Sequence, residues 1–122
     1  MPVVDVELVV SPNATVAAGL AQALADAVGD TLGSAPGQTW VRLRLLPHEQ
    51  YAENRSPVGM ADLPAFIRLL QRQPVEGAER TAEMMALTRA VAQVLGRPLD
   101  RVHIEYAPPA AGRVAFGGSI VT

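Results

Sequence analysis

Hydrophobic residues alternate with other positions near the start of the chain, as they do in a strand. One face of residues 3–10 is fully apolar, with Val4, Val6, Leu8 and Val10. A period of two residues is typical of a β-strand. The alternation returns in residues 39–46, where Val41, Leu43 and Leu45 alternate with Trp40, Arg42 and Arg44. Both segments are therefore predicted to be strands.

Between these segments the hydrophobic period changes to that of a helix. Apolar residues recur every four positions, at Val16, Leu20, Leu24, Val28 and Leu32, with polar residues on another side. Ser11 is a residue type that caps helices, and Pro12 fits a first helical turn. Gly33 and Pro36 supply a stop signal. The pattern predicts an amphipathic helix of about five turns that ends near Gly33.

The second half of the chain repeats this order. Residues 64–109 resemble residues 2–47 at an offset of 61 to 63 residues, each copy starts with a proline, and the second helix is expected at residues 75–95. Self-similarity at a fixed offset indicates an internal duplication. Arg68 falls where Val6 predicts an apolar side chain, which indicates that the strand phase shifts by one residue between the copies.

These elements predict an α+β, two-layer fold in a single domain over residues 1–122. Each strand-helix-strand crossover is expected to be right-handed and to pair its two strands in parallel. Two such units give a four-stranded mixed sheet with both helices on one face. The other face is left bare, and a bare sheet face with apolar groups usually meets another subunit.

The composition removes several kinds of chemistry. The chain has no Cys and no Lys, so thiol and lysine Schiff-base chemistry are excluded, and all ten basic side chains are Arg. With only His48 and His103, neither a metal centre nor a cofactor is expected. The net charge of −2 does not favour binding to nucleic acid. The chain shows neither a membrane-spanning apolar run nor a signal peptide pattern, so we expect a cytoplasmic protein.

The strongest candidate for chemistry is Pro2. If Met1 is removed, the chain begins with a secondary amine fixed on a sheet. An α-amino group has a pKa near ~7.7 to 8.0, which burial or a neighbouring cation lowers. A neutral amine can take a proton from carbon beside a carbonyl and return it elsewhere, which is keto-enol isomerisation. The alternative is a proline that simply begins a strand, since a retained Met1 would leave an amide without basicity.

The Met1-Pro2 start, the duplicated unit and the tail at residues 109–118 together resemble the tautomerase superfamily, typified by 4-oxalocrotonate tautomerase and macrophage migration inhibitory factor. The resemblance covers nearly the whole chain. It implies a fused two-unit member that forms a homotrimer, with active sites shared between subunits. It also implies that Pro2 is the general base in a cofactor-independent tautomerase acting on a small enolisable 2-oxo or enol acid. The alternative is a non-enzymatic trimer that keeps Met1.

Two arginines are candidates for binding the substrate carboxylate. Arg72 falls where the dehalogenase branch of that superfamily carries a carboxylate-binding arginine. Arg42 matches the strand arginine of 4-oxalocrotonate tautomerase. The alternative for Arg42 is an ion pair at a subunit interface, since Asp5 and Glu7 can lie on the same sheet face.

The resemblance implies three further pocket residues and two departures from the family pattern. His103 takes the place of Arg42 in the second unit and, with Glu105, is expected to approach Pro2 from a neighbouring subunit. Phe116 is expected to form an apolar wall. Pro12 stands where 4-oxalocrotonate tautomerase has a helix arginine. Ala115 stands where the dehalogenases have a water-activating acid, which argues against hydrolytic dehalogenation.

Overall fold

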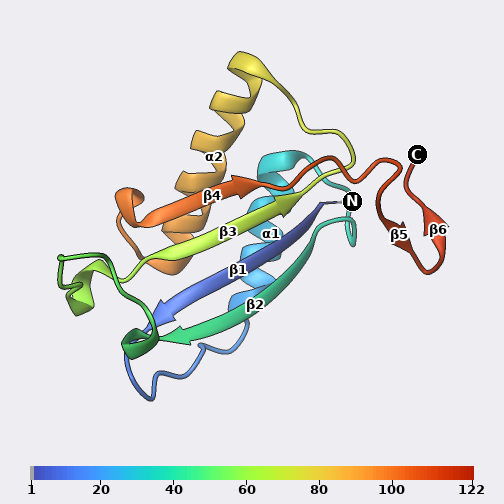
Figure 1. Ribbon diagram of the computed structural model, residues 1–122. Helices are drawn as coiled ribbons and strands as arrows, with labels where there is room; N and C mark the ends of the chain where they lie inside the picture. The colour runs from blue at the N-terminus through green and yellow to red at the C-terminus, as the bar shows by residue number, and fades with distance from the viewer. Residues whose placement is uncertain (1) are drawn as a thin grey trace.

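Two strand-helix-strand units build the chain, followed by a short hairpin (Figure 1). The computed structural model describes residues 2–122. The elements are β1 (Val3–Val10), α1 (Leu20–Leu32), β2 (Trp40–Pro47), β3 (Ala65–Leu70), α2 (Gly77–Leu95), β4 (Val102–Tyr106), β5 (Ala115–Phe116) and β6 (Ser119–Ile120). Single 3-10 turns occupy His48–Gln50, Met60–Asp62 and Leu99–Arg101. No helix in the described part of the chain is long and apolar enough to cross a membrane.

The four long strands form one mixed sheet in the order β2-β1-β3-β4. Within each unit the two strands are parallel, with Val4 opposite Val41 in the first and Ala65 opposite Val102 in the second. The two units meet through the antiparallel pair β1 and β3. Both helices cover the same face of the sheet and leave the other face open (Figure 1). The predicted α+β fold is therefore confirmed.

The strand phase shifts by one residue between the two units, as Arg68 indicates. In β3 the buried, helix-side positions are Ala65, Ile67 and Leu69, while Arg68 is exposed on the opposite face. The residue opposite Arg68 in the sheet is Asp5. Since Pro64 directly precedes the helix-side residue Ala65, it takes the place of Val3 rather than that of Pro2. The two prolines that begin the copies are thus not structurally equivalent.

The first helix starts later than the hydrophobic pattern predicts. Residues 11–19 form a loop in which Ala14 N–H donates to Ser11 O at 3.1 Å and Asn13 has φ 61°. Pro followed by a residue with positive φ is typical of a type II turn, so Ser-Pro-Asn turns the chain instead of starting a helix. Gly19, with φ 81°, then sits directly before α1. Val16, assigned to the helix by its spacing, is 41% exposed.

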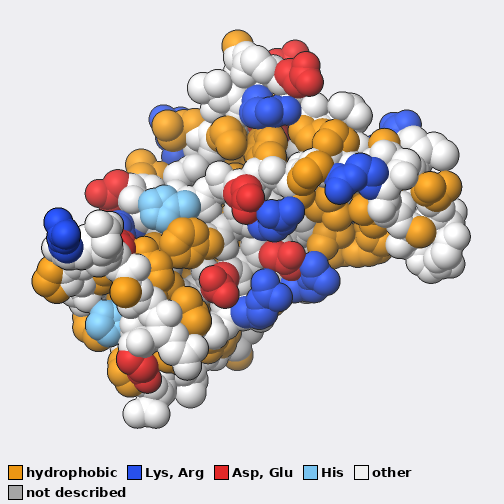
Figure 2. Space-filling model, viewed as in Figure 1, with side chains coloured by type: hydrophobic (Ala, Val, Ile, Leu, Met, Phe, Trp, Pro, Cys, Tyr) orange, Lys and Arg blue, Asp and Glu red, His pale blue; other side chains and the backbone are white. Residues whose placement is uncertain are grey.

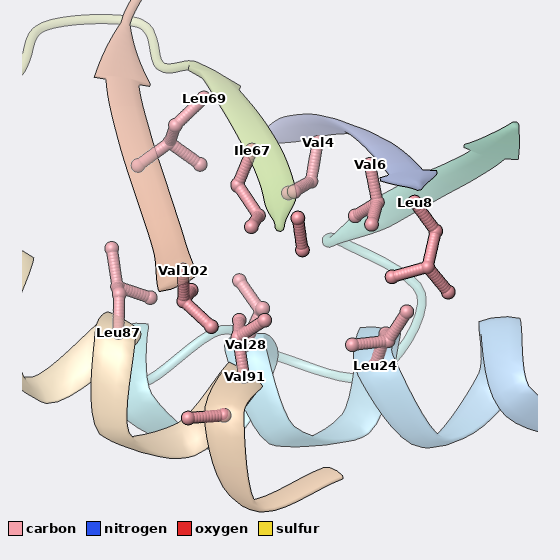
Figure 3. Packing of buried hydrophobic residues seen from close by; sticks show 12 residues of the cluster. Val4, Val6, Leu8, Leu24, Val28, Ile67, Leu69, Leu87, Val91 and Val102 are labelled. Atoms are coloured by element: carbon pink, nitrogen blue, oxygen red, sulfur yellow. The ribbon is translucent and has the colours of Figure 1, made fainter. Parts of the chain in front are cut away.

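An aliphatic core fills the space between the sheet and the helices (Figure 3). Its buried members are Val4, Val6, Leu8, Leu24, Val28, Ala65, Ile67, Leu69, Leu87, Val91, Ala92 and Val102. Burial of each large aliphatic side chain contributes about 1.5 to 3 kcal/mol. The described residues include no buried polar or charged side chain. This core fixes both helices against the sheet and so positions the groups at its edges.

The open sheet face carries charges at its centre. Arg42, Asp5, Arg68 and Glu105 stand opposite one another across the four strands. Arg42 Nε lies 2.6 Å from Asp5 Oδ1, and Arg68 Nη1 lies 3.1 Å from Glu105 Oε2. Figure 2 shows acidic and basic side chains intermixed at the centre of this face. Alternating charges of this kind pair with one another along the row, and exposed apolar groups such as Trp40 lie beside them.

Polar contacts hold the loop that connects β2 to β3, at the end of the sheet where β2 ends and β3 begins. Glu53 Oε2 accepts hydrogen bonds from Tyr51 Oη at 2.7 Å and from Arg101 Nη2 at 2.5 Å. These bonds hold the pKa of the Glu53 carboxyl below its ordinary value. Arg101 Nε also donates to Asp62 O at 2.6 Å. Tyr51 and Glu53 thus serve to fasten this loop to the start of β4.

Candidate functional site

Polar groups collect at the end of the sheet where β1 begins and β3 and β4 end. In these three strands the helix-side series of apolar residues ends in Pro2, Gln71 and Tyr106. Leu69 lies opposite Tyr106, and the antiparallel pairing of β1 with β3 brings Gln71 to the Pro2 end. The three residues therefore face the same space between the sheet and the helices.

A cavity of about 270 Å³ opens beside Pro2. Its walls come from the end of α1, from the segment after β3 and from α2, and its lining residues are Pro2, Leu32, Gly33, Ser34, Gln71, Arg72, Gln73 and Glu83. Pro2 is itself buried, and its carbonyl accepts a hydrogen bond from Trp40 N–H at 3.0 Å. This hydrogen bond fixes the start of the chain to β2, beside the cavity.

The turn after α1 shapes one wall of the cavity. Gly33 has φ 68°, a left-handed conformation that favours glycine, and the Ser34 N–H donates back to Gly29 O at 2.8 Å. This is the usual way in which a helix ends at a glycine. The turn sends the chain away from the helix axis and leaves room next to Pro2.

Arg72 is the only cation among the described residues that line this cavity. It lies two residues after the end of β3, and its backbone carbonyl accepts a hydrogen bond from Ala111 N–H at 3.1 Å. Its Nε donates to the carbonyl oxygen of Thr122. The tail of the chain therefore holds the Arg72 segment in place. Of the residues predicted from sequence to bind substrate, Arg72 is the one that shares a cavity with Pro2.

A carboxylate faces the same cavity from α2. Glu83 Oε1 accepts a hydrogen bond from Tyr106 Oη at 2.5 Å and one from Gln71 Nε2 at 3.4 Å. Burial raises the pKa of Tyr106, and its bond to Glu83 raises it further. Tyr106 is therefore a phenol that donates to the carboxylate. The Gln71 Oε1 atom is buried and has no hydrogen-bond partner in the described structure.

Sequence reasoning missed Glu83 and Gln71. A usable signal was present in the strands. Gln71 continues the helix-side parity of Leu69 past the end of β3. A polar residue that continues a buried series at a strand end indicates a site, because a buried polar group needs a partner.

Arg42, His103 and Glu105 lie on the open face of the sheet, across from the Pro2 cavity. The alternative proposed for Arg42, an ion pair, is what the structure shows, although within one chain: its guanidinium makes two hydrogen bonds to Asp5, at 2.6 and 2.9 Å, and they raise its pKa. His103 and Glu105 line a separate cavity of about 230 Å³ with Phe66. One chain does not bring these residues to Pro2, so their contribution from a neighbouring subunit stays a prediction.

Phe116 lies at the same end of the molecule as Pro2 but does not line its cavity. It packs edge to face on Trp40, with ring centroids 4.9 Å apart. Trp40 is the residue whose N–H is bonded to Pro2 O. Phe116 therefore supports the Pro2 segment through Trp40, and its predicted role as a pocket wall stays untested.

Another, larger groove, of about 670 Å³, runs between α1 and β2, and its titratable side chains are Asp26 and Asp30. Within residues 2–122 no group of three His, Asp or Glu side chains is placed to hold a metal ion. The Pro2 cavity, by contrast, combines the start of the chain with a guanidinium and a fixed carboxylate. It is the candidate active site.

Among the comparisons with known proteins, only the comparison with solved structures finds matches. No family model matches the sequence, and no curated protein matches it. The fused 4-OT F6, a wild-type asymmetric trimer, is 21% identical with a TM-score of 0.72, over 96% of this chain and 95% of its own. Pt0534 inactivated by 2-oxo-3-pentynoate is 18% identical with a TM-score of 0.72, over 98% of this chain and 94% of its own. The macrophage migration inhibitory factor of Trichinella spiralis is 16% identical with a TM-score of 0.69, over 97% of this chain and 98% of its own. The likeness lies in the fold, over nearly the full length of each chain.

Proposed function

We propose that this chain, which has the fold of the tautomerase superfamily, is a cofactor-independent tautomerase with Pro2 as its general base. The observation that carries the proposal is the placement of Pro2, which is buried and lines a cavity together with Arg72. The proposed substrate is a small enolisable 2-oxo or enol acid. The activity requires removal of Met1, which lies outside the described residues.

The proposed reaction moves one proton between two atoms of the substrate. The neutral Pro2 amine takes a proton from the substrate, whose electron pair delocalises onto the carbonyl as an enolate, and the secondary ammonium then returns the proton to another atom. Arg72 would bind the substrate carboxylate through charge-assisted hydrogen bonds. A volume of about 270 Å³ suits a small acid.

The experiment that tests this function measures ketonisation of 2-hydroxymuconate and of phenylenolpyruvate. The protein must begin at Pro2, as verified by intact mass. We expect acceleration of at least one of these reactions over the rate in buffer, in proportion to the protein concentration. A protein with a verified free Pro2 that accelerates neither would contradict the proposal.

We also propose that three copies of the chain assemble through the open sheet face. Support comes from the alternating charges on this face, from exposed Trp40 beside them, and from solved structures of the same fold that are trimers. In such an assembly a neighbouring copy would supply His103 and Glu105. Light scattering in solution should give the mass of three chains, and a monomer mass would contradict the assembly.

A further inference from the structure

Glu83 is the acidic group that the Pro2 cavity holds in addition to its cation. It comes from α2 (Gly77–Leu95), the helix of the second unit, whereas Pro2 belongs to the first unit. The two residues nevertheless line one cavity.

Glu83 is held in place by neutral donors. Tyr106 Oη donates to its Oε1 at 2.5 Å and Gln71 Nε2 does so at 3.4 Å. Arg80 approaches Tyr106 instead: its guanidinium lies 5.3 Å from the centroid of the Tyr106 ring and donates through Nε to Val75 O at 2.7 Å. None of the ion pairs among residues 2–122 involves Glu83. Its negative charge is therefore fixed in position without a directly paired cation.

From this geometry we infer that Glu83 is the counter-charge of the protonated Pro2 amine. The inference rests on the proposed function, since it describes how the same cavity handles the proton that Pro2 accepts. When the amine takes a proton from the substrate, a cation forms inside the cavity, and Glu83 stabilises it. Arg72 stabilises the substrate anion that forms in the same step.

The charged and titratable groups at the cavity thus divide into two sets with opposite effects on the amine. Arg72 disfavours the protonated form of Pro2, whereas Glu83 favours it. Tyr106 and Gln71 act through Glu83, because they fix the carboxylate that faces the cavity. Glu83 is accordingly a positioning and charge-balancing residue that handles no substrate proton itself.

The inference is tested by titrating the Pro2 amine directly. The protein must begin at Pro2, as verified by intact mass, and carry ¹⁵N-labelled proline, so that NMR follows the Pro2 nitrogen as the pH is changed. Glu83→Gln is expected to lower the pH of half-protonation by about one unit, since an opposite charge close by has an effect of this order. The matched control is Glu79→Gln on the exposed surface of the same helix, which should leave the titration unchanged.

A titration that is the same in Glu83→Gln and in the wild type would overturn the inference, provided that circular dichroism shows the fold intact. If Glu83→Gln does not fold, Glu83→Ala removes the same charge and takes its place. The readout does not depend on turnover. A shifted titration in a protein without tautomerase activity would therefore refute the proposed function and leave the role of Glu83 standing.

Discussion

A chain that carries extra residues ahead of Pro2 is expected to ketonise an enol acid at least about 100-fold more slowly than the chain that begins at Pro2. The extension turns the amine into an amide, which cannot accept a proton near neutral pH, and loss of a general base typically costs 10²- to 10⁴-fold. The measurement is kcat/KM for ketonisation of phenylenolpyruvate or 2-hydroxymuconate.

The same protein supplies the control for this experiment. Proteolytic removal of the extension, confirmed by intact mass, should restore the rate without any change of sequence from Pro2 onward. Pro12→Ala, at an exposed turn beyond the other end of β1, should leave the rate unchanged. Equal rates before and after cleavage would show that the amine is not the base. Equal rates that also match the rate in buffer would favour the non-enzymatic alternative.

Arg72→Ala is expected to raise KM for an enol acid by about 10- to 100-fold with a smaller change in kcat. Arg72 is the cation that shares the cavity with Pro2, and a hydrogen bond to a charged group contributes about 1.5 to 3 kcal/mol. Steady-state kinetics separate the two parameters. A substrate analogue whose carboxylate is replaced by a neutral amide should show a much smaller effect of the substitution.

Arg89→Ala is the matched control for Arg72, since it removes an exposed arginine from α2 and should change neither parameter. The bond from Arg72 to Thr122 O is also lost in Arg72→Ala, so the fold of the variant is compared with that of the wild type by circular dichroism. An unchanged KM in a folded Arg72→Ala protein would remove Arg72 from the substrate site.

Most of the fold could be predicted from the hydrophobic pattern, because the pattern depends on which face of each element is buried. The periods of two and of about four residues placed β1, β2 and α1, and the repeat of this order placed β3, α2 and β4. The start of α1 was misplaced because Val16 keeps the helical spacing, while the turn at Pro12 and Asn13 and the left-handed Gly19 determine the backbone. Spacing reports on side chains and is insensitive to such turns.

The candidate site was only partly predictable. Pro2 and Arg72 lie at strand ends, where the topology alone brings segments together. Glu83 reaches the cavity only through the packing of α2 on the sheet, which no local pattern encodes. The alternation in β2 and β4 could have placed Arg42 and His103 on the open face. The apolar residues next to each of them in its strand point toward the core.

The most direct test of the central claim, that Pro2 offers a reactive amine beside a carboxylate-binding arginine, is the mass of the protein after exposure to 2-oxo-3-pentynoate. A neutral amine adds to the electron-poor alkyne, so that a nitrogen–carbon bond forms and the amine proton moves to the adjacent carbon, with no leaving group. The expected result is one adduct with the mass of the whole reagent, located at Pro2 by fragmentation, in the chain that begins at Pro2 and not in the extended chain. A chain with a verified free Pro2 that stays unmodified, or that is modified elsewhere to the same extent as the extended chain, would contradict the claim.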